Sequence, residues 1–166
     1  GGGVSRRTGF NHFPSKNDVY LPPLLPYSQE ALEAFATDAE TPLTTLIQDL
    51  LEARWREANV DFDDLCILMK IGRESSELRM ALKEAVEGQR AALVTASARR
   101  TGKPEDSLEV LVLVGTVQAM ERAAFQSVVA RPGGSSAEMA DTVDRVIDVW
   151  ARLSAELIAG ISSTKP

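Results

Sequence analysis

The chain has 166 residues, of which 44% are apolar and 25% charged, and its formal net charge is −6. This is the size of one globular domain, or of one domain with the remnant of a second. Cys66 is the only cysteine, which excludes an intrachain disulfide framework and a cysteine-based zinc site. No apolar run approaches the ~20 residues of a membrane-spanning helix, so we expect a cytoplasmic protein without a membrane partner.

Positive charge at the start of the chain is separated from the acidic remainder. Residues 1–17 contain Arg6, Arg7 and Lys16 and no acidic residue. Because salt screens electrostatic fields over ~8–10 Å, local charge rather than the average decides whether a segment attracts phosphate. The opening GGGVSRR has neither a Met nor the apolar core of a signal peptide, and we expect residues to be missing upstream.

Helix-forming residues dominate the chain, and helix breakers separate them at spaced points. Thr41 before Pro42 has the pattern of a helix N-cap, and Gly102 with Pro104 marks the end of one helix and the start of another. After the break RPGGSSAE, either Ser135 or Ser136 can cap the last helix. We predict an all-α fold with helices at residues 5–13, 15–21, 27–37, 42–57, 62–72, 76–101, 105–130 and 136–160.

The last two predicted helices have apolar surfaces that one chain would leave uncovered. Residues 108–129 are apolar on nearly every face, so a helix here needs cover on both sides. A buried strand is the alternative, although no second strand is available to pair with it. Residues 136–160 carry an apolar stripe at steps of three and four, typical of a helix packed along another. We predict a homodimer through Leu111, Gly115, Ala119, Phe125, Val143, Val146, Trp150, Leu153 and Leu157.

The middle of the chain contains apolar residues interspersed with a few polar ones, a composition that suits a ligand pocket. Plain core is the alternative for each of these residues. Glu121 and Arg122 interrupt the apolar helix, and they suggest either an ion pair across the dimer or a ligand contact. The pocket that we predict, for an unknown small-molecule effector, is lined by Trp55, Phe62, Met69, Met80, Gln89, Leu93, Val117 and Met120.

The segment GVSRRTGFNHFPSKND, residues 3–18, reads as a short helix, a stop at Pro14 and the start of another helix. It resembles the recognition helix and following turn of the TetR family of bacterial transcriptional regulators. That family often shows a Gly-Val-Ser turn, then Thr-x-aromatic-x-His/Tyr-Phe, then x-Ser-Lys-x-Asp/Glu. The resemblance implies a TetR-like helical bundle in a bacterial cytoplasm, with DNA contacts from Ser5, Arg6, Arg7, Thr8, Asn11, His12 and Lys16.

Two departures from the family pattern matter. Gly9 stands where the family usually has a bulky residue, and a Gly within a helix costs roughly 1 kcal/mol relative to Ala. The two helices that precede the recognition helix in the family are not in this sequence. We therefore expect residues 1–26 to be the remnant of a helix-turn-helix domain and residues 27–166 to form the ligand-binding and dimerisation domain. This stretch of chain alone is expected to bind operator DNA poorly.

The resemblance implies a DNA-binding transcriptional regulator, a repressor by family default, that a small-molecule effector releases from its operator. The alternative is a helical ligand-binding or protein-interaction module that does not bind DNA. No nucleophile, acid/base or metal constellation is visible, so we expect no enzyme and no cofactor. Asp61, Asp63 and Asp64 lack the spacing of a calcium loop and are better explained as charge at a helix N-terminus.

Overall fold

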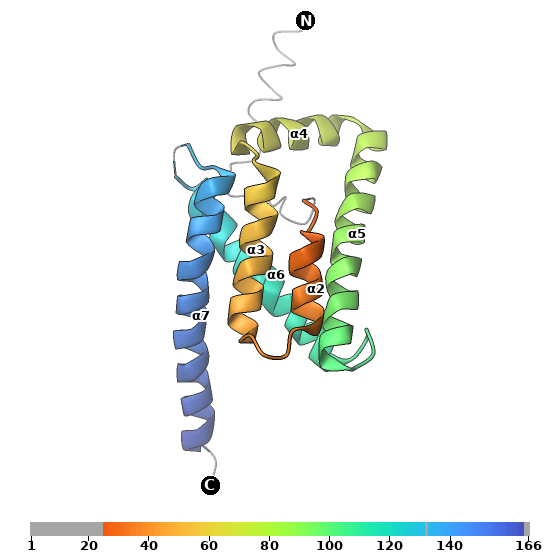
Figure 1. Cartoon of the computed structure of the whole chain (residues 1–166). Coiled ribbons are helices and arrows are strands. Elements are labelled where there is room, and N and C mark those ends of the chain that lie inside the picture. Colours follow the sequence, from red (N-terminus) through yellow and green to blue (C-terminus); the bar gives the residue numbers. More distant parts are fainter. Residues whose placement is uncertain (1–24, 132, 165–166) are drawn as a thin grey trace, which may run out of the picture.

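The computed structural model describes residues 25–131 and 133–164, without the side chains of Cys66 and Met69. The helices predicted at 5–13 and 15–21 lie outside the described residues. The described part is an all-α structure of six helices, labelled α2 to α7 in Figure 1. They are α2 (Gln29–Thr37), α3 (Leu43–Ala58), α4 (Phe62–Glu74), α5 (Ser76–Thr101), α6 (Leu108–Val129) and α7 (Ser136–Thr164).

The predicted helix boundaries from residue 27 onward agree with the structure to within four residues. The strand alternative for residues 108–129 is wrong, because this stretch forms the helix α6. The one β-type pairing in the described part is an isolated bridge between Asp61 and Ser135, which ties the α3–α4 turn to the α6–α7 turn. The all-α prediction is therefore confirmed, while the assignment to a TetR fold stays a prediction.

Side-chain caps explain where most of these helices begin. Ser28, Ser75, Ser107 and Ser135 each accept a hydrogen bond from a backbone N–H three residues later. Ser135 is thus the residue that caps α7. The prediction that Thr41 caps α3 is wrong, because the Thr41 hydroxyl donates to the Asp38 carboxylate, 2.7 Å away, and stabilises the preceding turn instead.

The helices enclose one core, with α4 lying across one end of the molecule (Figure 1). α7 packs against α3 and α6, while α5 packs against α2, α4 and α6. Three rings meet within the core: the ring centroids of Trp55 and Phe62 are 5.8 Å apart, and those of Phe62 and Phe125 are 5.1 Å apart. Such tilted and edge-on pairs favour aromatic packing. α7 continues past the body at the end opposite α4 (Figure 1).

The turn between α6 and α7 depends on the absence of a side chain at Gly134. A Cβ there would lie 2.7 Å from the Val128 carbonyl oxygen, which is backbone and cannot rotate away. We expect Gly134→Ala to destabilise the protein by more than about 1 kcal/mol, as overpacking does. Gly88→Ala is the matched control, because nothing lies within 4 Å of its Cβ and Ala favours a helix. Equal denaturant midpoints for the two variants would contradict this account.

Candidate functional site

A charged pair is buried at the centre of the body. Arg54 of α3 and Glu121 of α6 are 2% and 1% exposed, and the Arg54 Nη1 to Glu121 Oε1 distance is 2.7 Å. The second carboxylate oxygen of Glu121 accepts a hydrogen bond from Trp55 Nε1 at 2.9 Å. Burial raises the pKa of the Glu121 carboxyl, against the opposing effect of Arg54 and of the Trp55 N–H.

Arg54 also binds the chain that leads into α2. Its Nε donates to the Leu25 carbonyl oxygen at 2.8 Å, and its guanidinium lies 4.0 Å from the centre of the Tyr27 ring. The Tyr27 backbone N–H donates to Gln89 Oε1 of α5, and burial raises the pKa of the Tyr27 hydroxyl. Together these contacts make a cluster that we call the buried latch: Leu25, Tyr27, Arg54, Trp55, Gln89 and Glu121.

The buried latch corrects the expectation for Glu121. An ion pair across a dimer is excluded for this residue, because its carboxylate pairs with Arg54 of the same chain and is fully enclosed. Sequence reasoning missed Arg54 because a charged residue on a helix is usually exposed. Its position directly before Trp55, on the apolar side of α3, was the available signal.

The residues predicted to line an effector pocket do not form one shared cavity. Met80 is 64% exposed, and the Gln89 side chain is engaged with Tyr27. The remainder are packed in the core, which is the plain-core alternative, and the Met69 side chain lies outside the described residues. The residues placed in the core are Trp55, Phe62, Leu93, Val117 and Met120.

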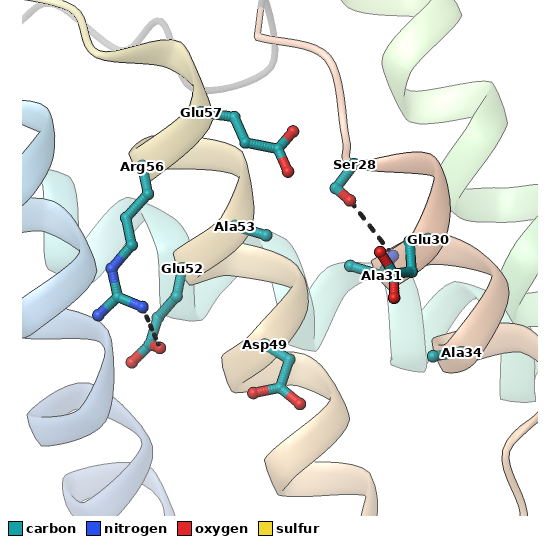
Figure 2. Close-up of a pocket in the computed structure, with 9 residues that line it drawn as sticks. All are labelled: Ser28, Glu30, Ala31, Ala34, Asp49, Glu52, Ala53, Arg56 and Glu57. Carbon is teal, nitrogen blue, oxygen red and sulfur yellow. Dashed lines mark hydrogen bonds and ion pairs between the residues drawn. The ribbon is translucent and has the colours of Figure 1, made fainter.

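One hollow in the described structure is a pocket of about 480 Å³ between α2 and α3, shown in Figure 2. Ala31, Ala34 and Ala53 line it together with one cation, Arg56, and several carboxylates. Arg56 lies 3.4 Å from Glu52, which reduces the positive charge that it offers to a solute. The carboxylates of the pocket are those of Glu30, Asp49, Glu52 and Glu57, so its field disfavours anions.

A second hollow is a groove of about 730 Å³ at the end of the molecule opposite α4. Its lining comes from the start of α3, the end of α5, the start of α6 and the middle of α7. We call it the apolar groove, and its lining residues are Leu43, Thr44, Ile47, Thr101, Leu108, Glu109, Val112, Leu113, Thr116 and Trp150. Its chemistry suits an apolar occupant.

The predicted dimer residues divide into buried, half-buried and exposed groups. Phe125 and Val143 are 2% and 1% exposed, so their assignment to a dimer interface is wrong: they fill the core of their own chain. Val146 is half-buried against that core. The others are exposed, and they lie on α6 and α7: Leu111, Gly115, Ala119, Trp150, Leu153 and Leu157.

Exposed apolar side chains gather on these two helices. In the described part, nine of the twelve exposed large hydrophobic side chains belong to α6 or α7. A surface of this kind usually marks an interaction site. The predicted DNA contacts cannot be placed beside it, because Ser5, Arg6, Arg7, Thr8, Asn11, His12 and Lys16 all lie outside the described residues.

The acidic residues at the start of α4 act on the helix itself. Asp61 caps α4 by accepting from the Asp63 N–H at 2.7 Å, in agreement with a role at a helix N-terminus. Over residues 25–131 and 133–164, no three His, Cys, Asp or Glu side chains are grouped to hold a metal ion. None of the helices α2 to α7 is both long and apolar enough to cross a membrane.

Removing Glu121 from the buried ion pair should lower the free energy of unfolding far more than removing Glu33 from the exposed ion pair with Arg99. Glu121→Leu leaves the Arg54 charge uncompensated, and we expect a loss of about 3–5 kcal/mol in urea unfolding. The double variant Arg54→Met/Glu121→Leu should recover part of that loss. Glu33→Leu is the matched control, since Glu33 also lies 2.7 Å from an arginine, Arg99, but in solvent. Equal losses for the two single variants would contradict a special role of burial.

The pocket carboxyl of Glu52 should make stability depend on pH. Burial and the adjacent Asp144 carboxyl raise the pKa of Glu52 to about 7, while Gln48 and Arg56 act in the opposite direction. Between its ordinary value of 4.5 and pH 7, the folded state binds more protons than the unfolded state. Stability therefore falls as pH rises through this window.

We expect Glu52→Gln to abolish that fall and to stabilise the protein at pH 8 by about 1–3 kcal/mol. Asp144→Asn should reduce the pH dependence without abolishing it, because burial of Glu52 remains. The measurement is urea unfolding from pH 4.5 to pH 8. A profile for Glu52→Gln parallel to that of the unchanged protein would exclude Glu52 as the responsible group.

Comparison with protein-family models, with curated proteins and with solved structures returns no match for this chain. The resemblance of residues 3–18 to the TetR recognition helix therefore stays a prediction. The proposed function therefore rests on the sequence of residues 3–18 and on the geometry of the described body.

Proposed function

We propose that this protein is a homodimeric, DNA-binding transcriptional regulator, acting as a repressor that a small-molecule effector releases from its operator. The observation that carries the proposal is the match of residues 3–18 to the turn, recognition helix and following helix start of the TetR family. That segment holds Arg6, Arg7 and Lys16, within a chain of net charge −6. Arg side chains are the groups that most often read guanine in the major groove, and Lys favours phosphate.

The described body supports the proposal in two ways. Its outer α6 and α7 surface is apolar, as a dimer interface requires, and a dimer would place two recognition helices on successive half-sites. The buried latch holds Leu25, the first described residue after the basic segment, through Arg54 to Glu121 of α6. A rearrangement of α6 thus has a physical route to Leu25, where the described chain begins.

In energetic terms, the effector must bind the DNA-free arrangement more tightly than the DNA-bound one. A preference of 1–3 kcal/mol, typical of allosteric coupling, is about 5- to 150-fold in operator affinity. Alterations of the buried latch would then change the coupling between effector and operator more than they change either affinity alone.

The decisive test is footprinting of the complete protein on the DNA upstream of its own gene, at low salt. We expect one protected stretch with two half-sites, and at least a tenfold loss of affinity for Arg7→Ala. Lys103→Ala is the matched control, because it removes the same charge from the exposed α5–α6 turn. An absence of any protected DNA would refute the proposal and favour a helical module that works without DNA.

A further inference from the structure

The contact between α3 and α7 contains a carboxyl group that is shielded from water. Glu52 of α3 is 9% exposed, and its side chain extends toward the neighbouring α7 in Figure 2. Asp144 of α7 lies within hydrogen-bonding reach of the Glu52 carboxyl. We call these two residues the carboxyl pair. Glu52 therefore titrates inside a contact between two helices, and not only at the surface of the α2–α3 pocket.

The groups around Glu52 compensate its charge only in part. On α3, Gln48 Nε2 donates to Glu52 Oε1 at 3.3 Å, and Arg56 Nη1 lies 3.4 Å from Oε2. The Arg56 side chain is 61% exposed, so water screens its effect. On α7, the guanidinium of Arg145 donates to a hydroxyl of its own helix. The acidic groups that face the pocket from α2 and α3 add further negative charge, and they are Glu30, Asp49 and Glu57.

Two carboxyl groups in contact attract each other only when they share a proton. Burial, and after it the Asp144 carboxyl, raise the pKa of Glu52 to about 7, while Gln48 and Arg56 act in the opposite direction. Below this pH the contact is a hydrogen bond between a carboxyl and a carboxylate. Above it, two anions face each other. The sign of this α3–α7 contact thus changes near neutral pH.

Beyond Asp144, few other contacts hold α7 on the body. Ile147 is the last buried residue of α7, and from Asp148 to Thr164 every residue is exposed except the half-buried Ser154. Trp150 lines the apolar groove but is itself 39% exposed. A helix segment with so little buried apolar surface opens locally at a low cost in free energy. A change in one polar contact at its base can therefore decide how often it opens.

We propose that the carboxyl pair is a proton-controlled contact: a shared proton holds α7 on α3, and loss of that proton to water releases α7 from Asp144 onward. Residues 136–143 stay packed in the core, since Met139 and Val143 are buried there. In the released state, water reaches Glu52 and the two anions separate. The inference concerns α7 within one chain and rests on neither operator binding nor dimerisation.

The expected size of the effect follows from proton linkage. The closed state binds a proton with a Glu52 pKa of about 7, and the released state does so at the ordinary value of 4.5. Closure is therefore favoured at low pH, and this advantage is lost as the pH rises through 7. Between pH 6 and pH 8.5, we expect the equilibrium constant for release to rise about tenfold.

The experiment is amide hydrogen exchange of the full chain at pH 6 and pH 8.5, corrected for the intrinsic exchange rate. We expect the protection of the amides of residues 145–151 to fall about tenfold at the higher pH. The fall should persist unchanged in low concentrations of urea, because a local opening exposes little surface. Equal protection at the two pH values would overturn the proposal. So would a fall that occurs only through urea-sensitive opening, because it would then reflect unfolding of the whole body.

Three variants assign the effect to the carboxyl pair. Glu52→Gln should keep residues 145–151 at their pH 6 protection throughout. Asp144→Asn should weaken the pH dependence, and it tests the same pair without changing a buried residue, because Asp144 is exposed. Glu156→Gln is the matched control, an exposed acid further along α7, and should retain the tenfold fall. A Glu52→Gln profile that matches the Glu156→Gln profile would overturn the proposal.

Discussion

The rest of the structure depends on the burial of Arg54 against Glu121. Two opposite charges removed from water, 2.7 Å apart and each less than 3% exposed, stabilise the fold only if their remaining hydrogen-bonding groups are also satisfied. Trp55 Nε1 and the Leu25 carbonyl oxygen supply two of those bonds. The pair therefore dictates more than its own geometry: it fixes how α3 crosses α6 and where the chain enters α2.

One donor of Arg54, its Nη2, is buried without a hydrogen-bond partner. An unsatisfied buried donor lowers the free energy of unfolding, so the pair stabilises the protein less than a fully hydrogen-bonded pair would. The pair instead favours a single packing arrangement, since any other register of α3 on α6 would bury the charge of Arg54 or of Glu121 without its partner. We regard the pair as an element that selects one packing of the body, and the face of Tyr27 against the guanidinium extends that selection to the start of the body.

The helices could be predicted from the sequence because residues next to each end determine where a helix begins and stops. Ser75, Ser107 and Ser135 cap the helices that follow them, and Gly102 adopts the left-handed conformation that ends α5. The ion pair could not be predicted, because its partners are 67 residues apart and only the packed body brings them together. The spacing of the α7 stripe predicts a packing face, which the structure confirms for its first half only, because periodicity does not say what covers a stripe. Its first half, with Val143, faces the chain's own core, and its second half, with Leu157, faces solvent.

α6 lies between an exposed apolar surface and the buried ion pair. The outer surface of α6 is available to a second copy, whereas its inner surface carries Glu121. Any association that shifts α6 must carry Glu121 with it, and Glu121 cannot move alone without exposing an uncompensated Arg54 charge. Arg54 in turn holds the Leu25 carbonyl. Under the proposed dimer, a shift of α6 at its outer surface would therefore reach the chain that enters the body through Glu121 and Arg54.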